Sequence, residues 1–167
     1  RFLFQNGIPV FAESTLTSES LGVQLMDSGK LSRLDYSKVV TYVGRNGCKE
    51  GKALLDLKLI DAKGLFLALK DQIRLRIVEC FSWPYGEFII DSREAPPNDT
   101  QHFRVDVYQL LQRGLEAHWG PERILTDLTP HLNLYPSPTK RLATVRERLM
   151  SDGAVESFLN ALDGSST

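Results

Sequence analysis

The chain has 167 residues, about the size of one domain, with 20 basic and 21 acidic side chains and a net charge of −1. This balance argues against a non-specific nucleic-acid binder, because such a protein needs excess cations to neutralise phosphates. Apolar residues make up 42% of the chain, yet no apolar run reaches about 18 residues, so the sequence predicts a globular protein without a membrane span.

The cysteine content and the first residues indicate the cellular compartment and the relation of this chain to a longer protein. Two cysteines, Cys48 and Cys80, are too few for a disulfide scaffold and predict a reduced, cytoplasmic environment. No charged-then-apolar signal peptide opens the sequence. Because a strand is predicted from residue 1 onward, without Met or a lead-in, we expect the chain to be a fragment of a longer protein.

The opening residues place apolar side chains at every second position and predict a β-hairpin over residues 1–13. Apolar side chains occupy alternate positions on both sides of Asn6-Gly7: Phe2, Phe4, Ile8, Val10 and Ala12. Asn-Gly favours a tight hairpin turn because both residues tolerate positive φ. A hairpin is marginal by itself. Residues 87–91 alternate in the same way, so we expect them to add a third strand to a small antiparallel sheet.

An internal repeat follows the hairpin, because residues 22–43 align with residues 51–72 after a shift of 29 positions. Each copy has the pattern of a short helix, a turn, a capping residue and a second helix. We therefore predict two helix–turn–helix repeats, at residues 21–43 and 50–72, which bury their apolar faces on each other. The aligned pairs include Gly22 with Gly51, Leu25 with Leu54, Tyr36 with Leu65, and the predicted N-caps Ser32 with Asp61.

The second helix of the second repeat is predicted to continue to about residue 82, where Trp83-Pro84 ends it. Apolar side chains recur every four residues along this helix, and further apolar side chains beside them widen the stripe. We therefore expect the helix to be packed on more than one side. Helical spacing returns over residues 103–118. Gly120-Pro121 then breaks the pattern, and residues 120–167 predict a C-terminal helical extension that is cut short.

The sequence contains no motif typical of catalysis or metal binding. The three histidines, His102, His118 and His131, include no pair at helical ligand spacing and no His-Glu-x-x-His string. Residues 47–53 partly match a phosphate-binding loop, but the glycines are one residue too close and Ala53 replaces the Mg²⁺-binding Ser or Thr. We therefore predict a non-enzymatic protein with no cofactor and no metal.

Three stretches carry a family resemblance. They are the opening "FLFQNGIPVFAEST", the repeated "SLGVQLMDSGKLS" and "EGKALLDLKLID", and the helix end "LKDQIRLRIVECFSWPYGEF". In this order they resemble the hairpin, the repeat and the closing helix of PATAN-type domains, a bacterial signalling module. The resemblance covers residues 1–118. It implies a regulatory, protein-interacting domain joined to other signalling modules, with no catalytic residues to transfer.

Two alternative functions stay open. The repeat also resembles the N-terminal domain of type II secretion and pilus ATPases, which binds cyclic di-GMP, so a second-messenger receptor is the second hypothesis. That family's motif begins Arg-Leu-Gly, where this chain has Ser20-Leu21-Gly22 and Lys49-Glu50-Gly51. The third hypothesis is a winged-helix DNA-binding domain, with a basic helix over residues 139–150 as the reading element.

We thus predict a mostly helical α+β protein with a PATAN-like domain at residues 1–118 and an extension at 120–167. Its predicted role is that of a signalling adaptor that binds a protein partner, without membrane insertion. Nucleic acid is the disfavoured partner, and a homodimer stays open. Predicted contact surfaces are the loop over residues 45–52, the surroundings of Tyr85, the Pro96-Pro97 loop and the basic helix. The candidate contact residues are Arg45, Lys49, Lys52, Tyr85 and Arg141.

Overall fold

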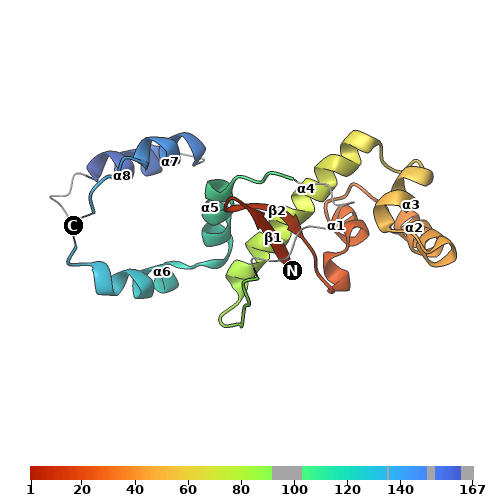
Figure 1. The fold of residues 1–167 in the computed structure, drawn as a ribbon, viewed down its shortest axis with the longest axis horizontal. Helices are drawn as coiled ribbons and strands as arrows, with labels where there is room; N and C mark the ends of the chain where they lie inside the picture. Colours follow the sequence, from red (N-terminus) through yellow and green to blue (C-terminus); the bar gives the residue numbers. More distant parts are fainter. Residues whose placement is uncertain (92–102, 135, 150–152, 163–167) are drawn as a thin grey trace. The chain divides into compact units, whose positions relative to one another are not determined.

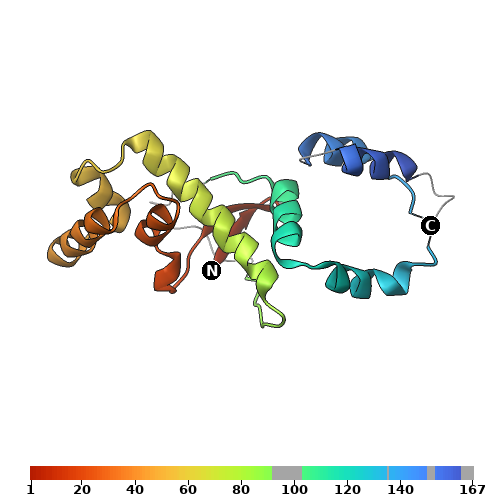
Figure 2. The ribbon, with the colours of Figure 1, turned by 180° about the vertical axis from the view of Figure 1, so that it is seen from behind.

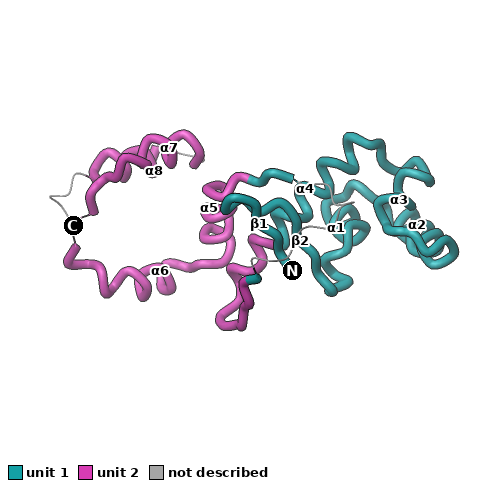
Figure 3. The backbone as a smooth tube through the Cα atoms, in the orientation of Figure 1, with its two compact units in different colours: residues 1–76, 91–105 teal, residues 77–90, 106–167 magenta. Residues whose placement is uncertain are grey.

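A computed structural model describes residues 1–91, 103–134, 136–149 and 153–162. Over these residues the chain is a mostly helical α+β protein, as predicted, and it has eight α-helices and one two-stranded antiparallel sheet. The chain forms two compact units (Figure 3). Unit 1 comprises residues 1–76 and 91–105, and unit 2 comprises residues 77–90 and 106–167. The predicted division near residue 119 stays a prediction.

Unit 1 contains the hairpin and both repeats (Figure 1). Its elements are β1 (Phe2–Gln5), β2 (Ile8–Ala12), the 3-10 turn η1 (Thr17–Glu19), α1 (Leu21–Asp27), α2 (Arg33–Asn46), α3 (Glu50–Asp56) and α4 (Ala62–Glu79). The helix α4 is uninterrupted (Figure 2), and its last three residues belong to unit 2.

Unit 2 contains the shorter helices. They are η2 (Cys80–Ser82), α5 (Val107–His118), α6 (Pro121–Leu128), η3 (Thr129–His131), α7 (Leu142–Arg148) and α8 (Gly153–Ala161). The helix α5 begins four residues later than predicted, because Asp106 caps it. The Asp106 Oδ1 accepts a hydrogen bond from the backbone N–H of Tyr108 at 2.9 Å.

The hairpin forms as its Asn-Gly turn predicts. Asn6 has φ 52° and Gly7 has φ 76°, the left-handed conformations that a tight two-residue turn needs. The strands pair antiparallel, with Phe2 opposite Ala12, and the register shifts between Leu3 and Phe4. A small antiparallel sheet therefore opens unit 1.

The predicted third strand over residues 87–91 is wrong. The sheet of the described residues has two strands, and residues 87–91 form no strand, with Ile89 95% exposed. Alternation shows only that a segment is able to form a strand, whereas a strand exists where a neighbouring backbone completes its hydrogen bonds. In unit 1 the carbonyl oxygen of Val10 in β2 instead accepts from the backbone N–H of Phe103 at 3.1 Å.

The backbone confirms the 29-residue repeat. The helices α1 and α3 have seven residues each and begin 29 positions apart. The turn that follows each helix contains one residue with positive φ. These residues are Gly29 (φ 70°) and Lys58 (φ 55°), again 29 positions apart. The shared turn geometry shows that the aligned residues have equivalent structural roles.

Both predicted N-caps are confirmed. The Ser32 Oγ accepts from the backbone N–H of Asp35 at 3.1 Å, and its hydroxyl donates to the Asp35 carboxylate at 2.7 Å. The Asp61 Oδ1 accepts from the backbone N–H of Gly64 at 2.7 Å. These bonds satisfy N–H groups that have no partner inside the helix.

The paired glycines allow close approach of the next helix in each repeat. A Cβ added to Gly22 would lie 2.5 Å from a ring carbon of Tyr36, and one added to Gly51 would lie 3.3 Å from a methyl carbon of Leu65. Tyr36 and Leu65 are themselves an aligned pair of the repeat. The same packing contact therefore occurs twice, and it is tighter in the first copy.

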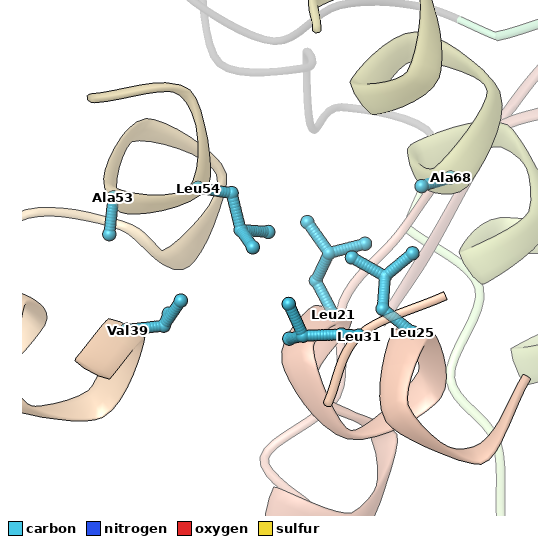
Figure 4. Packing of buried hydrophobic residues seen from close by; sticks show 7 residues of the cluster. All are labelled: Leu21, Leu25, Leu31, Val39, Ala53, Leu54 and Ala68. Carbon is cyan, nitrogen blue, oxygen red and sulfur yellow. The ribbon is translucent and has the colours of Figure 1, made fainter. Parts of the chain in front are cut away.

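The core of unit 1 is a hydrophobic cluster to which α1, α2, α3 and α4 all contribute. Its buried members are Leu21, Leu25, Leu31, Val39, Ala53, Leu54 and Ala68 (Figure 4). Leu54 and Val39 are completely buried. The two repeats thus bury their apolar faces on each other, as predicted.

Polar side chains of α4 attach the hairpin to the repeats. The Arg76 guanidinium donates to the carbonyl oxygens of Ala12 and Glu19, both at 2.8 Å. The Gln72 amide also donates to the Glu19 carbonyl, at 2.9 Å. These bonds satisfy carbonyl groups at the ends of β2 and η1, where the regular backbone hydrogen bonding stops.

Unit 2 is organised around Phe81 in η2. Its ring lies against Gly114 of α5, where an added Cβ would overlap the ring. Its carbonyl oxygen accepts from the indole N–H of Trp119 and from the guanidinium of Arg123, both at 3.3 Å. The Arg123 guanidinium also lies 4.1 Å from the centre of the Trp119 ring, a cation–π contact.

Candidate functional site

Two adjoining hollows, of about 260 Å³ and 290 Å³, lie along one face of α4 in unit 1. Leu25, Lys30 and Ala68 line both hollows, so we treat the pair as one feature, the α4 groove. Its α4 side consists of Gly64, Leu67, Ala68, Asp71, Arg74 and Leu75. Facing residues come from α1, from α3 and from the turns after them: Leu21, Gln24, Leu25, Ser28, Lys30, Leu31, Leu54, Leu59 and Ile60.

Helical periodicity places the α4 residues of the groove on one face. They recur at intervals of three and four, which is the spacing of one side of a helix. Gln72 and Arg76, which bond the end of β2 and η1, lie outside that face. One side of the helix is therefore bonded to the hairpin region, and another side borders the groove.

The groove is lined by small residues of α4 and bordered by two large apolar ones. Gly64 allows the Ile60 side chain to lie close against α4, and Leu25 points toward the small side chain of Ala68 (Figure 4). Leu67 and Leu75 stand at the rim with 49% and 45% of their surface exposed. From Gly64 to Leu75 the helix rises about 16 Å, at about 1.5 Å per residue.

The charged side chains that line the groove leave one uncompensated cation. The Arg74 guanidinium lies 3.2 Å from the Asp71 carboxylate, so these two charges offset each other. Lys30 lies where the two hollows join, and among the described residues its ammonium has no carboxylate partner within ion-pair distance. The lining therefore has a net charge of +1, from two cations and one anion.

Three of the predicted contact residues belong to the exposed segment around the α2–α3 turn. Arg45 is in the last turn of α2, Lys49 is the N-cap residue of α3, and Lys52 is one turn further on. The Lys52 ammonium lies 2.8 Å from the Asp56 carboxylate, which also accepts the Tyr42 hydroxyl at 3.0 Å. Lys52 is thus already paired within the protein.

The pKa shifts of this cluster follow from its hydrogen bonds. Hydrogen bonds from Lys52 and then from Tyr42 lower the pKa of Asp56 below its ordinary value. The same carboxylate raises the pKa of Lys52 and of Tyr42 through its hydrogen bonds to them. The hydrogen bonds thus favour the charged forms of Asp56 and Lys52 and the neutral phenol of Tyr42. These three polar groups are hydrogen-bonded to one another at the surface.

The glycine turn at Gly22, proposed for nucleotide binding, is occupied from within the chain. The Glu50 carboxylate accepts from the backbone N–H of Gly22 at 2.9 Å, in a partly buried position. An external phosphate would have to displace this anion from the first turn of α1. This contact leaves the N–H of Gly22 already bonded, which disfavours the second-messenger hypothesis at this position.

The remaining predicted residues, Tyr85 and Arg141, belong to unit 2. Tyr85 is 89% exposed, and Arg141 is exposed at the N-cap position of α7. The basic helix is shorter than the predicted 139–150, since α7 begins at Leu142 after an irregular segment. The Pro96-Pro97 loop lies outside the described residues.

Two arginines of α7 are already paired within unit 2. Arg146 lies 3.5 Å from the Glu156 carboxylate and donates to Asn160 at 2.8 Å. Arg148 lies 3.5 Å from the Asp106 carboxylate. These pairs leave less positive charge for DNA than the sequence count indicates.

Sequence reasoning missed Lys30 and the groove beside it. A signal was present, because Leu67 and Leu75 are eight residues apart and lie outside the main stripe of Leu65, Leu69 and Ile73. A second apolar stripe on one helix marks a second packing surface. Which surface a neighbour covers depends on the tertiary arrangement.

No family model matches the chain, and no curated protein or solved structure matches it. The resemblance to PATAN-type domains therefore stays a prediction. Across the described ranges, no three His, Cys, Asp or Glu side chains gather where they could hold a metal ion. Among those same residues, no helix combines the length and apolar character needed to cross a membrane.

Proposed function

We propose that this protein is a non-enzymatic interaction module and that its α4 groove binds a helical segment of a partner protein. The observation that carries the proposal is the apolar groove itself, with Leu67 and Leu75 half exposed at its rim. Contiguous exposed apolar surface is typical of interaction sites. The resemblance to PATAN-type domains supports a regulatory role within a larger signalling protein.

The shape of the groove favours a helix as its occupant. An amphipathic helix presents anchors at positions i, i+4 and i+7, which span about 10 Å, and the groove is about 16 Å long. The two hollows, at about 260 Å³ and 290 Å³, adjoin at Leu25, Lys30 and Ala68 and follow α4 one after the other, so the space is elongated. A ridge of two or three side chains fits this elongated space better than a compact ligand.

The chemistry of the lining supports binding rather than catalysis. The hydroxyl of Ser28 donates to the carbonyl oxygen of Leu25 at 3.1 Å. Asp71 is paired with Arg74. A nucleophile needs an adjacent base within hydrogen-bond reach, and the described groove residues contain no such pair.

Binding of a designed helical peptide tests this function. The peptide has leucines at i, i+4 and i+7 and an uncharged polar face, and its fluorescence anisotropy is followed as protein is added. We expect saturable binding that Leu67→Asp weakens about tenfold or more, because the variant places a charge against apolar side chains.

The matched control is Leu34→Asp in α2, where the leucine is 71% exposed and does not line the groove. It should leave the affinity unchanged, and circular dichroism should show that both variants are folded. The proposal fails if the peptide does not bind, or if a scrambled peptide without an apolar face binds equally well.

A further inference from the structure

We propose that the partner of the α4 groove is an acidic amphipathic helix whose carboxylate pairs with Lys30; this rests on the proposed function of the groove. Lys30 lines both hollows and is the cation of the lining that no described carboxylate compensates. Charge complementarity at the centre of an apolar groove selects among helices that have the same apolar anchors.

The backbone at Lys30 is held in place by its turn. Gly29 has φ 70°, and the N–H groups of Lys30 and Leu31 both donate to the Leu25 carbonyl, at 2.8 Å and 3.0 Å. The Cα of Lys30 is therefore fixed beside α1. Only the side chain needs to be ordered when a partner binds, which limits the entropic cost.

The repeat shows that a charge at this position is a departure from internal symmetry. Lys30 aligns with Leu59 in the second repeat, and both residues line the larger hollow. Two structurally equivalent turns thus present a cation and an apolar side chain to one space. A helix lying there would need an acidic residue opposite Lys30 and an apolar residue opposite Leu59. This difference between the two ends also fixes the direction in which the helix lies.

The neighbouring charges do not cancel this preference. Asp71, the carboxylate of the lining, lies 3.2 Å from Arg74. A glutamate on the partner would therefore meet Lys30 without a competing acidic side chain of the lining, whereas a lysine would meet a like charge. For an exposed or partly exposed pair, this difference is about threefold to tenfold in affinity.

Three peptides with identical leucines and different flanking residues test the inference on the unmodified protein. The flanks are Glu, Gln or Lys, and dissociation constants are measured by anisotropy at low and high salt. We expect the Glu peptide to bind tightest and the Lys peptide weakest, about tenfold apart at low salt. The gap should narrow at high salt because of screening.

Variants then locate the effect. Lys30→Glu should make the Lys peptide bind more tightly than the Glu peptide. Lys30→Met should make these two peptides bind equally and should leave the affinity for the Gln peptide unchanged. Lys70→Glu is the control, because it makes the same charge change on α4 outside the groove lining. It should preserve the order.

The outcomes separate this inference from the function on which it rests. If all three peptides bind equally, the acidic partner is wrong and the helix-binding groove stands. If no peptide binds, the proposed function fails as well. If dodecanoate, an aliphatic carboxylate, displaces the Glu peptide and binds more tightly than it, the site takes an acyl chain and a helical partner is wrong.

Discussion

Units 1 and 2 differ in how they use their apolar side chains. In unit 1 four helices enclose one hydrophobic cluster, in which Leu54 and Val39 are completely buried. In unit 2, α6 and the residues after it expose a row of leucines: Leu125, Leu128, Leu132 and Leu134, each more than half exposed. Apolar content alone therefore does not make a core, because each apolar face also needs a partner surface.

The repeat explains the difference. Duplication of a helix–turn–helix provides two faces of matching shape, so each copy covers the other. Unit 2 relies instead on single aromatic and polar contacts, such as Phe81 against Gly114 and the Trp119 indole on the Phe81 carbonyl. Substitutions should therefore have different effects in the two units.

The largest expected effect is in the unit 1 core. Leu54→Ala should lower the free energy of unfolding by about 3 kcal/mol, because it removes a completely buried side chain and leaves a cavity. Leu128→Ala, in the exposed row of unit 2, should lower it by less than about 0.5 kcal/mol. Urea denaturation measures both, and equal losses would contradict the contrast between the units.

Glycine substitutions should change stability in opposite directions. Gly114→Ala should destabilise unit 2 by about 1–3 kcal/mol, because the new methyl group would overlap the Phe81 ring. Gly44→Ala in α2 should stabilise unit 1 by about 0.5–1 kcal/mol, because nothing lies near the added carbon and alanine favours the helix. Thermal unfolding of both variants tests the signs, and destabilisation by Gly44→Ala would show an unseen contact.

The Tyr42–Asp56–Lys52 network should make a small contribution to the free energy of unfolding that is lost in acid. The folded pKa of Asp56 lies below the ordinary value of 3.8, so its stabilisation is complete above that pH. It is lost as the pH falls from 3.8 through the folded pKa. Midpoints of thermal unfolding of wild type and Asp56→Asn should therefore differ by a constant amount near neutral pH and converge below pH 3.8. A difference that persists in acid would point to another cause.

The smallest effect is expected in residues 87–91. Because Phe88, Ile89 and Ile90 are 85–95% exposed, Ile89→Ser should change stability by less than about 0.5 kcal/mol. Their amide hydrogens should exchange rapidly, whereas the paired amides of β2 should be protected. Slow amide hydrogen exchange at residues 88–90 would instead support the third strand that the sequence predicted.

Local features of this chain could be predicted because neighbouring residues decide them. Asn6-Gly7 determines the hairpin turn, Ser32 and Asp61 mark helix starts, and the shift of 29 aligns two equivalent turns. The residue types at these positions satisfy backbone hydrogen bonds or dihedral angles within a few residues. Their outcome therefore depends little on the rest of the fold.

The site needed information that no local pattern contains. Lys30 and Lys52 are both lysines of the repeats, yet Lys52 is paired with Asp56 while Lys30 stands uncompensated in the groove. In the same way, Phe88 and Val10 both occur in alternating segments, and only Val10 is buried. Which charge finds a partner depends on distances between segments, and these exist only after folding.

The amino-acid sequence by itself thus determined the helical character, the hairpin, the caps and the repeat, because hydrogen bonding and side-chain periodicity act over a few residues. Tertiary structure alone decided that α4 would border an open groove, that Glu50 would accept from the N–H of Gly22, and that residues 87–91 would form no strand. These features arise from the packing of distant segments, whose apolar faces and charges are covered or left open only when the helices come together.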